Sequence, residues 1–145
     1  MPIVSRTAHA YRVGYYEQDS PPGFDATVFA PSVDFKFKND TTSYILVQTR
    51  AENDDTLYYD LYGTSDGRVS KVTTPVILST TPALPDIHQD DPTLPKGQIK
   101  QVDFAVAGAN VVFSRTVTRN SQTLIQETYH SNYQPWANIF LVGTM

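Results

Sequence analysis

Asp86, His88 and Asp90 are the residues of this sequence whose types and spacing are best suited to holding a metal ion. Alternate side chains of an extended segment point to the same side, so the two carboxylates and the imidazole could face one ion. Zn²⁺ and other divalent ions accept both kinds of ligand. A polar connecting segment can carry the same spacing as ordinary solvated surface. The sequence therefore allows zinc or another divalent ion here, held within one chain or between two, and it indicates no other cofactor.

Four aromatic side chains form a second candidate site, because flat apolar rings can stack on the faces of sugar rings. Tyr58 and Tyr62 share one side of an alternating segment, while Tyr133 and Trp136 lie close to Pro135. For Trp136 we favour the alternative that it fills a small core. The tyrosine pair could equally line a half-buried sheet face with its hydroxyl groups at the rim.

The composition bounds the class of protein. The chain has 145 residues, 40% of them hydrophobic and 18% charged, which is enough for one folded domain or two small ones. The net charge of −4 argues against an electrostatic grip on nucleic acid or on an anionic membrane. The absence of cysteine excludes disulfides, thiolate metal sites and a thiol nucleophile from this chain. No apolar run approaches the roughly 20 residues of a membrane span, and the first residues lack the pattern of a signal peptide.

Strands must position these side chains, because the recurrent hydrophobic pattern has period two between polar breaks. Residues 33–38 alternate, which predicts a strand with one buried face, followed by a turn at 39–43. The apolar run 44–48 predicts a strand covered on both sides, and the alternation at 57–61 predicts its partner across a hairpin turn at Asn53-Asp54-Asp55. We take residues 11–63 as one β unit.

The rest of the chain predicts a connector and then a second small sheet. Residues 73–97 predict an extended connector, because proline lacks the backbone donor that a central strand requires. Its prolines are Pro75, Pro82, Pro85, Pro92 and Pro95. Residues 98–106, 111–119, 123–129 and 139–142 then read as strands, with Asn120-Ser121 at one break. The predicted fold is all-β and elongated, with two small antiparallel β units joined by the Pro-rich connector.

Several strings in the first part carry a family resemblance. They are Arg6-Thr7-Ala8-His9, Tyr15-Tyr16, Gly23-Phe24-Asp25-Ala26-Thr27-Val28 and Asp34-Phe35-Lys36-Phe37-Lys38-Asn39. Together they resemble the closing half of the VanW-like domain of bacterial envelope proteins. The second part, from Leu94-Pro95-Lys96-Gly97 to Leu141-Val142-Gly143-Thr144, resembles the G5-like module that often follows such a domain. The hairpin that is commonly Asn-Gly in that module reads Asn120-Ser121 here.

The resemblance implies a chemical hypothesis for His9 and Asp25. VanW-like domains usually carry an upstream Gly-Gly-Gly-x-Cys-Gln segment, which is not in this chain, so the chain looks truncated. With such a cysteine, His9 and Asp25 would complete a Cys-His-Asp triad like that of thiol acyl-transferases of the transglutaminase kind. Without the nucleophile the chain should be inactive. The alternative, which we favour, is that both are ordinary polar residues near a strand end and a turn.

We therefore expect residues 1–67 to be a VanW-like unit, 68–97 a connector and 98–145 a G5-like module. The resemblance implies that the protein is located in the cell wall or elsewhere outside the cell, and that it belongs to a group of proteins associated with glycopeptide resistance. The expected function is non-catalytic: weak binding of peptidoglycan or another wall glycan, or surface display. A fragment of a thiol acyl-transferase and a spacer or adhesin stalk stay as alternatives. Exposed edge strands could pair copies into a homo-oligomer.

Overall fold

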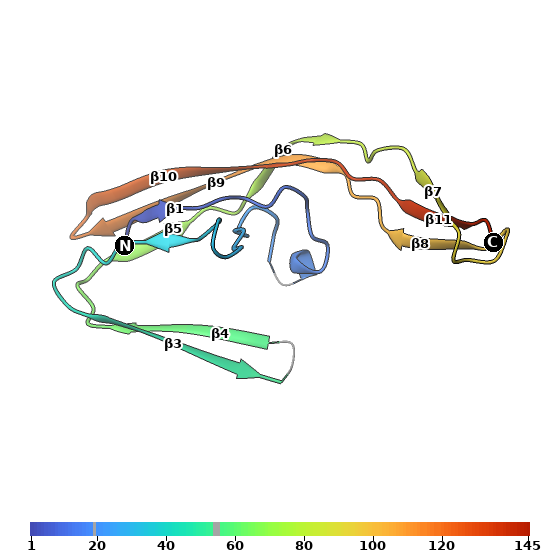
Figure 1. Cartoon of the computed structure of the whole chain (residues 1–145). Coiled ribbons are helices and arrows are strands. Elements are labelled where there is room, and N and C mark those ends of the chain that lie inside the picture. Colours follow the sequence, from blue (N-terminus) through green and yellow to red (C-terminus); the bar gives the residue numbers. More distant parts are fainter. Residues whose placement is uncertain (19, 54–55) are drawn as a thin grey trace.

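The computed structural model describes residues 1–18, 20–53 and 56–145, and within them strands are the main regular structure (Figure 1). Within these ranges the helical structure is a single 3-10 turn, η1 (Tyr16–Gln18). The predicted all-β class is confirmed. The strands are β1 (Ile3–Ser5), β2 (Lys36–Phe37), β3 (Ile45–Glu52), β4 (Thr56–Gly63), β5 (Val69–Val72), β6 (Val76–Thr81), β7 (Ile87–Asp91), β8 (Ile99–Asp103), β9 (Gly108–Arg119), β10 (Gln122–Tyr133) and β11 (Ile139–Gly143).

A long antiparallel hairpin of β9 and β10 forms the centre of the molecule. Asn120 and Ser121 make its turn with φ angles of 50° and 63°. These are the two positive values that a two-residue type I′ turn requires, and they match the twist of the flanking strands. The strands predicted on either side of this turn are confirmed.

The segment predicted as a connector is extended, but it also supplies strands to two sheets. β5 and β6 both pair antiparallel with β9. β7 pairs in parallel with β11, whose other edge is taken by β8. The second part of the chain is therefore not a sheet of its own, and this part of the prediction needs correction. The prolines misled it because they flank the strands, as Pro75 and Pro82 flank β6, where their missing donors cost no ladder hydrogen bond.

The core is small and lies where the N-terminal segment covers the central hairpin. Along β9, Ala109, Val111 and Phe113 are buried at every second position, as expected for a strand with one covered face. Phe24 packs edge-on against Phe113, with ring centroids 4.8 Å apart. Figure 1 shows the N-terminal segment running along β9 and β10. The two halves of the chain therefore touch directly.

The β3–β4 hairpin stands apart from the rest of the molecule (Figure 1). The prediction that residues 44–48 are covered on both sides is wrong, because Leu46 is 60% and Val47 48% exposed. A two-stranded ribbon has no second layer to cover it among the described residues. Of its predicted turn, Asp54 and Asp55 lie outside the described residues. The ribbon's edges pair with no other described strand, and the homo-oligomer expected from such edges stays a prediction.

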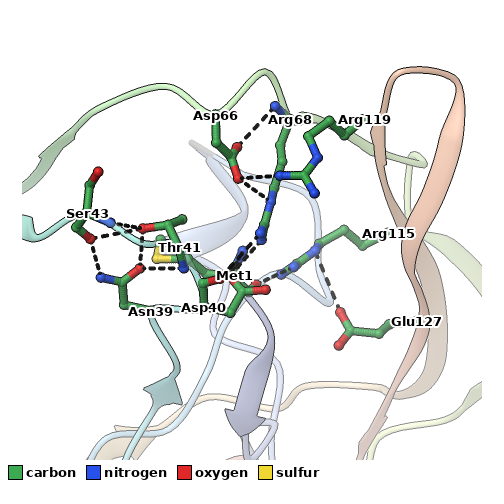
Figure 2. A network of polar contacts seen from close by, with 10 residues as sticks. All are labelled: Met1, Asn39, Asp40, Thr41, Ser43, Asp66, Arg68, Arg115, Arg119 and Glu127. Carbon is green, nitrogen blue, oxygen red and sulfur yellow. Dashed lines mark hydrogen bonds and ion pairs between the residues drawn. The ribbon is translucent and has the colours of Figure 1, made fainter.

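A network of charged side chains fixes the base of this hairpin to the central sheet (Figure 2). Arg68 bridges two carboxylates, with nitrogen–oxygen distances of 2.6 Å to Asp40 and 2.8 Å to Asp66. Asp66 also pairs with Arg119 at the end of β9, at 3.3 Å. Beside it, the predicted turn at 39–43 is closed by Asn39, whose amide donates to the Ser43 carbonyl at 2.8 Å. The hairpin is thus held to the central sheet at its base.

Candidate functional site

The carboxyl group of Asp25 is the centre of the candidate site. Its Oδ2 lies 2.6 Å from His9 Nδ1, and its Oδ1 accepts a hydrogen bond from the Tyr133 hydroxyl. The Gly23 amide also donates to Oδ1, at 3.3 Å. Three parts of the chain therefore converge on one carboxylate: the segment after β1, the Gly23 turn and the end of β10.

The turn that carries Asp25 is shaped by a glycine and an arginine. Gly23 has a φ of 107°, which side chains rarely permit, and a Cβ there would come within 2.9 Å of Val111 Cγ1. Arg6 Nη2 donates to the carbonyls of Gly23 and Asp25, at 2.6 Å each. It also reaches Ser131 Oγ on β10 at 3.2 Å. This cross-link fixes the turn against the central hairpin and so aims Asp25 at Tyr133.

The charges of this cluster follow from its partners. Burial acts to raise the pKa of Asp25, but hydrogen bonds from Tyr133 and His9 outweigh it and hold that pKa below its ordinary value. Burial, together with the hydrogen bond to Asp25, raises the pKa of Tyr133 to about 12. At neutral pH Asp25 is therefore a carboxylate that accepts, and Tyr133 is a phenol that donates.

The His9 ring is oriented by this carboxylate. Because Asp25 is charged, Nδ1 is the donor of the 2.6 Å bond, and in the neutral imidazole Nε2 is then the acceptor. Nε2 has no hydrogen-bond partner among the described residues, and the ring lies 5.8 Å from that of Tyr16. The structure thus brings together the two residues that the sequence joined. A carboxylate-oriented imidazole is the arrangement of a general base.

A hollow of about 320 Å³ opens beside Asp25. We call it the Asp25 groove. Across it, Arg12 is held by Glu17 through two bonds of 2.7 and 2.6 Å, and that contact raises the pKa of Arg12. The groove therefore combines aromatic side chains with one fixed cation, Arg12, and two carboxylates, those of Asp25 and Glu17. It is lined by Arg12, Val13, Tyr16, Glu17, Ser20, Pro21, Pro22, Phe24, Asp25 and Tyr133.

The four predicted aromatic residues lie in two separate places. Tyr58 and Tyr62 share one face of β4, as predicted, but the Arg50 guanidinium lies over the Tyr58 ring, 3.6 Å from its centroid. Tyr133 is only 3% exposed, so its ring face is not available to stack on a ligand.

Trp136 lies beyond β10, is half-buried and is not one of the buried core residues, which differs from the core position predicted for it. Its Nε1 donates to Asp103 Oδ2 at 2.7 Å, and Tyr11 packs edge-on against it with centroids 4.7 Å apart. It lines a second hollow of about 280 Å³, which we call the Trp136 hollow. The residues of this hollow are Tyr11, Arg12, Asp103, Phe104, Val106 and Trp136.

The predicted metal ligands lie at β7, where other contacts engage two of them. Asp86 accepts a hydrogen bond of 2.8 Å from Asn138, and the His88 ring stacks on Phe140 with centroids 5.2 Å apart. Within the described ranges no three His, Asp or Glu side chains are placed to hold a metal ion, Asp86, His88 and Asp90 included. A zinc site here stays an expectation from spacing alone.

Sequence reasoning missed the other half of the site. It gave no role to Arg12, Tyr16 or Glu17, and it considered Tyr133 only as a ring. Tyr133 is 108 positions from Asp25, and neither residue is exceptional in its local sequence. The one available signal was a pair of opposite charges, Arg12 and Glu17, in a segment otherwise rich in aromatic residues.

Comparison with known proteins finds one family and two solved domains that are similar to parts of this chain. The family described as "VanW like protein" matches residues 1–62. Among solved structures, an IgA1 protease G5 domain is similar at 18% identity and a TM-score of 0.33, over 53% of this chain and 89% of that one. HP0197-G5 is similar at 17% identity and a TM-score of 0.27, over 52% of this chain and 97% of that one. No curated protein matches the chain.

The resemblance to a VanW-like segment is thereby confirmed, and the chain is also similar to G5 domains, as the sequence suggested. The VanW-like match agrees with the coarse expectation of a bacterial cell-envelope module. In the described part of the chain, no helix has the length and apolar character needed to cross a membrane.

Proposed function

We propose that this chain is a cell-envelope module that binds wall glycan in the Asp25 groove. The observation that carries the proposal is the convergence of Asp25, Arg12 and Tyr16 on one hollow. Ligand sites are typically hollows of about 300–1,000 Å³ with a mostly apolar wall and a few fixed polar groups. At about 320 Å³ the groove is at the small end of that range. The VanW-like match supports the location.

The chemistry of the groove suits a sugar ring. A pyranose has an apolar face of C–H groups and a rim of hydroxyls that both donate and accept. Tyr16, 47% exposed, offers an apolar ring with a polar end. Asp25 and Glu17 can accept from hydroxyls, and Arg12 Nη1, which has no partner among the described residues, can donate to a ring or carbonyl oxygen. Because these groups are already fixed by their neighbours, little ordering is needed on binding.

Binding to insoluble peptidoglycan, with soluble glycan fragments as competitors, tests the proposal. Wild-type protein should bind saturably and be displaced, and Tyr16→Ala should lose most of that binding. Tyr59→Ala is the matched control, because Tyr59 is 66% exposed on β4 and lines no part of the groove. Equal binding by Tyr16→Ala and wild type, or no binding by either, would reject the proposal.

The same assay with a chelator tests the divalent ion that the spacing of Asp86, His88 and Asp90 allows. Retention that is lost with chelator and restored by Zn²⁺ would support the ion, and Asp86→Asn and His88→Ala would then be the variants to compare. If retention on peptidoglycan does not change with chelator, binding does not require a divalent ion.

A second candidate function rests on the His9–Asp25 bond. With Nε2 free to accept a proton, His9 has the geometry of the base in a thiol acyl-transferase whose cysteine comes from outside this chain. The test measures transfer of an acyl group from an activated ester to an added small thiol. Wild type should accelerate the transfer and His9→Ala should not. Equal rates with wild type, His9→Ala and no protein would remove this candidate.

The spacer alternative is disfavoured by two features. A stalk would have halves that meet only through a connector, whereas here Arg6 links the first segment to Ser131 on β10. A stalk would also need no hollows, whereas two lie at this junction.

A further inference from the structure

The Asp25 groove and the Trp136 hollow share a wall. Arg12 lines both, with Tyr16 and Glu17 on one side of it and Tyr11 and Trp136 on the other. The two hollows therefore lie next to each other, on either side of Arg12.

Backbone contacts hold this shared wall in place. Gln134 N donates to the Ala10 carbonyl at 2.7 Å, which fixes the segment that carries Tyr11 and Arg12 to the end of β10. Trp136 and Val106 exchange backbone hydrogen bonds of 2.8 and 3.2 Å, which fix the far side of the Trp136 hollow. The relative position of the two hollows is thus set by main-chain bonds and not by flexible side chains.

The Trp136 hollow repeats the chemistry of the groove. It has three aromatic walls, of which Phe104 is the most open at 68% exposed. Its polar groups are the Asp103 carboxylate, which is fixed by the indole N–H, and the Arg12 guanidinium. Each hollow again offers ring surface for an apolar sugar face and charged groups for its hydroxyls.

We infer that the two hollows are consecutive subsites for one extended glycan strand, with Arg12 lying between adjacent sugars. This inference rests on the proposed function and names the ligand more closely: an oligosaccharide and not a single sugar. Neither hollow is large, at about 320 and 280 Å³, so one sugar unit in either buries little surface. Two linked units bind as one ligand, and the second gains from the effective concentration that the first creates.

In the experiment, wild-type protein is titrated with uncross-linked peptidoglycan glycan fragments of increasing length, and calorimetry measures the affinity for each fragment. A longer fragment should bind at least about tenfold more tightly than a single disaccharide. Phe104→Ala should bring the affinity for the long fragment down towards that for the disaccharide. Phe29→Ala is the matched control, because Phe29 is 70% exposed and lines neither hollow. Both side chains are exposed, so both variants should keep the wild-type far-UV circular dichroism spectrum.

The outcomes separate this inference from the proposed function. The two-subsite inference is overturned if the affinity of wild type does not depend on fragment length, or if Phe104→Ala binds the long fragment as Phe29→Ala does. In either case the groove proposal stands as long as Tyr16→Ala abolishes binding. If no fragment binds and peptidoglycan is not retained, both fail. Length-dependent affinity that Phe104→Ala removes supports both.

Discussion

Replacing Tyr133 with phenylalanine tests whether the Asp25 cluster is a charge-based clamp. The substitution removes one hydroxyl and keeps the ring, which is 3% exposed and packed at the end of β10. It leaves Asp25 Oδ1 with only the longer contact from the Gly23 amide, at 3.3 Å. The segment from His9 to Asp25 then loses one of the hydrogen bonds that hold it to the central hairpin, the bond between Asp25 and Tyr133.

The expected size follows from the type of bond lost. A hydrogen bond to a charged group contributes about 1.5–3 kcal/mol to stability. For a domain of this length, each kcal/mol corresponds to about 2–4 °C in Tm. We therefore expect Tyr133→Phe to unfold at a temperature lower by about 3–12 °C at pH 7.

The pH dependence identifies the cause. The folded-state pKa of Asp25 lies below its ordinary value, so Asp25 contributes stability above the ordinary pKa of about 3.9 and loses it as pH falls through the folded pKa. The variant lacks part of that contribution. The difference in unfolding free energy between wild type and Tyr133→Phe should therefore be largest at pH 7 and become smaller below about pH 4.

Urea unfolding followed by the fluorescence of Trp136, the only tryptophan, measures this difference between pH 7 and pH 3. Tyr59→Phe is the control, because Tyr59 is an exposed tyrosine and its loss of a hydroxyl should change stability by less than about 0.5 kcal/mol. Wild-type stability in Tyr133→Phe at pH 7 would refute the clamp. A loss that stays constant down to pH 3 would show that packing, and not the charge of Asp25, is responsible.

Two further substitutions test the fold that positions the site. Ser121→Gly should stabilise the protein by up to about 1.5 kcal/mol, because relief of about 1–2 kcal/mol at a positive φ outweighs the entropic cost of glycine, about 0.5–1 kcal/mol. A lower urea midpoint would contradict the φ of 63°. Gly143→Ala should cost about 1–3 kcal/mol or more, because its Cβ would meet the Pro95 carbonyl, whereas Gly14→Ala, with nothing within 4 Å, should not destabilise. Equal midpoints for the two alanine variants would contradict the placement of β11 beside Pro95.

Period-two patterning predicted the class of fold and most of the central hairpin, because each strand there has one covered face. The alternation of β9 is visible in the sequence and returns as the buried residues Ala109, Val111 and Phe113. The prediction for residues 44–48 failed, since it rested on a continuous apolar run and not on alternation. Such a run does not say whether a covering layer exists.

The pairings that the sequence did not reveal are long-range. β7 lies parallel to β11, and Asp25 meets Tyr133 across 108 positions. Local propensity carries no information about partners at that distance, and proline excludes only central strand positions, whereas here it borders the strands. His9 and Asp25 were joined through a family resemblance, whereas Arg12 and Glu17 had no such guide.

The candidate site belongs to neither part of the chain alone. Most of the Asp25 groove comes from the segment that matches the VanW-like family, but Tyr133, which fixes the Asp25 carboxylate, comes from β10 outside that match. The Trp136 hollow is divided in the same way, with Tyr11 on the first segment and Trp136, Asp103 and Phe104 on the second. The first segment cannot supply these partners by itself, and β9 and β10 cannot supply the groove. The junction between the two parts, and not either module, is therefore where a ligand would be recognised.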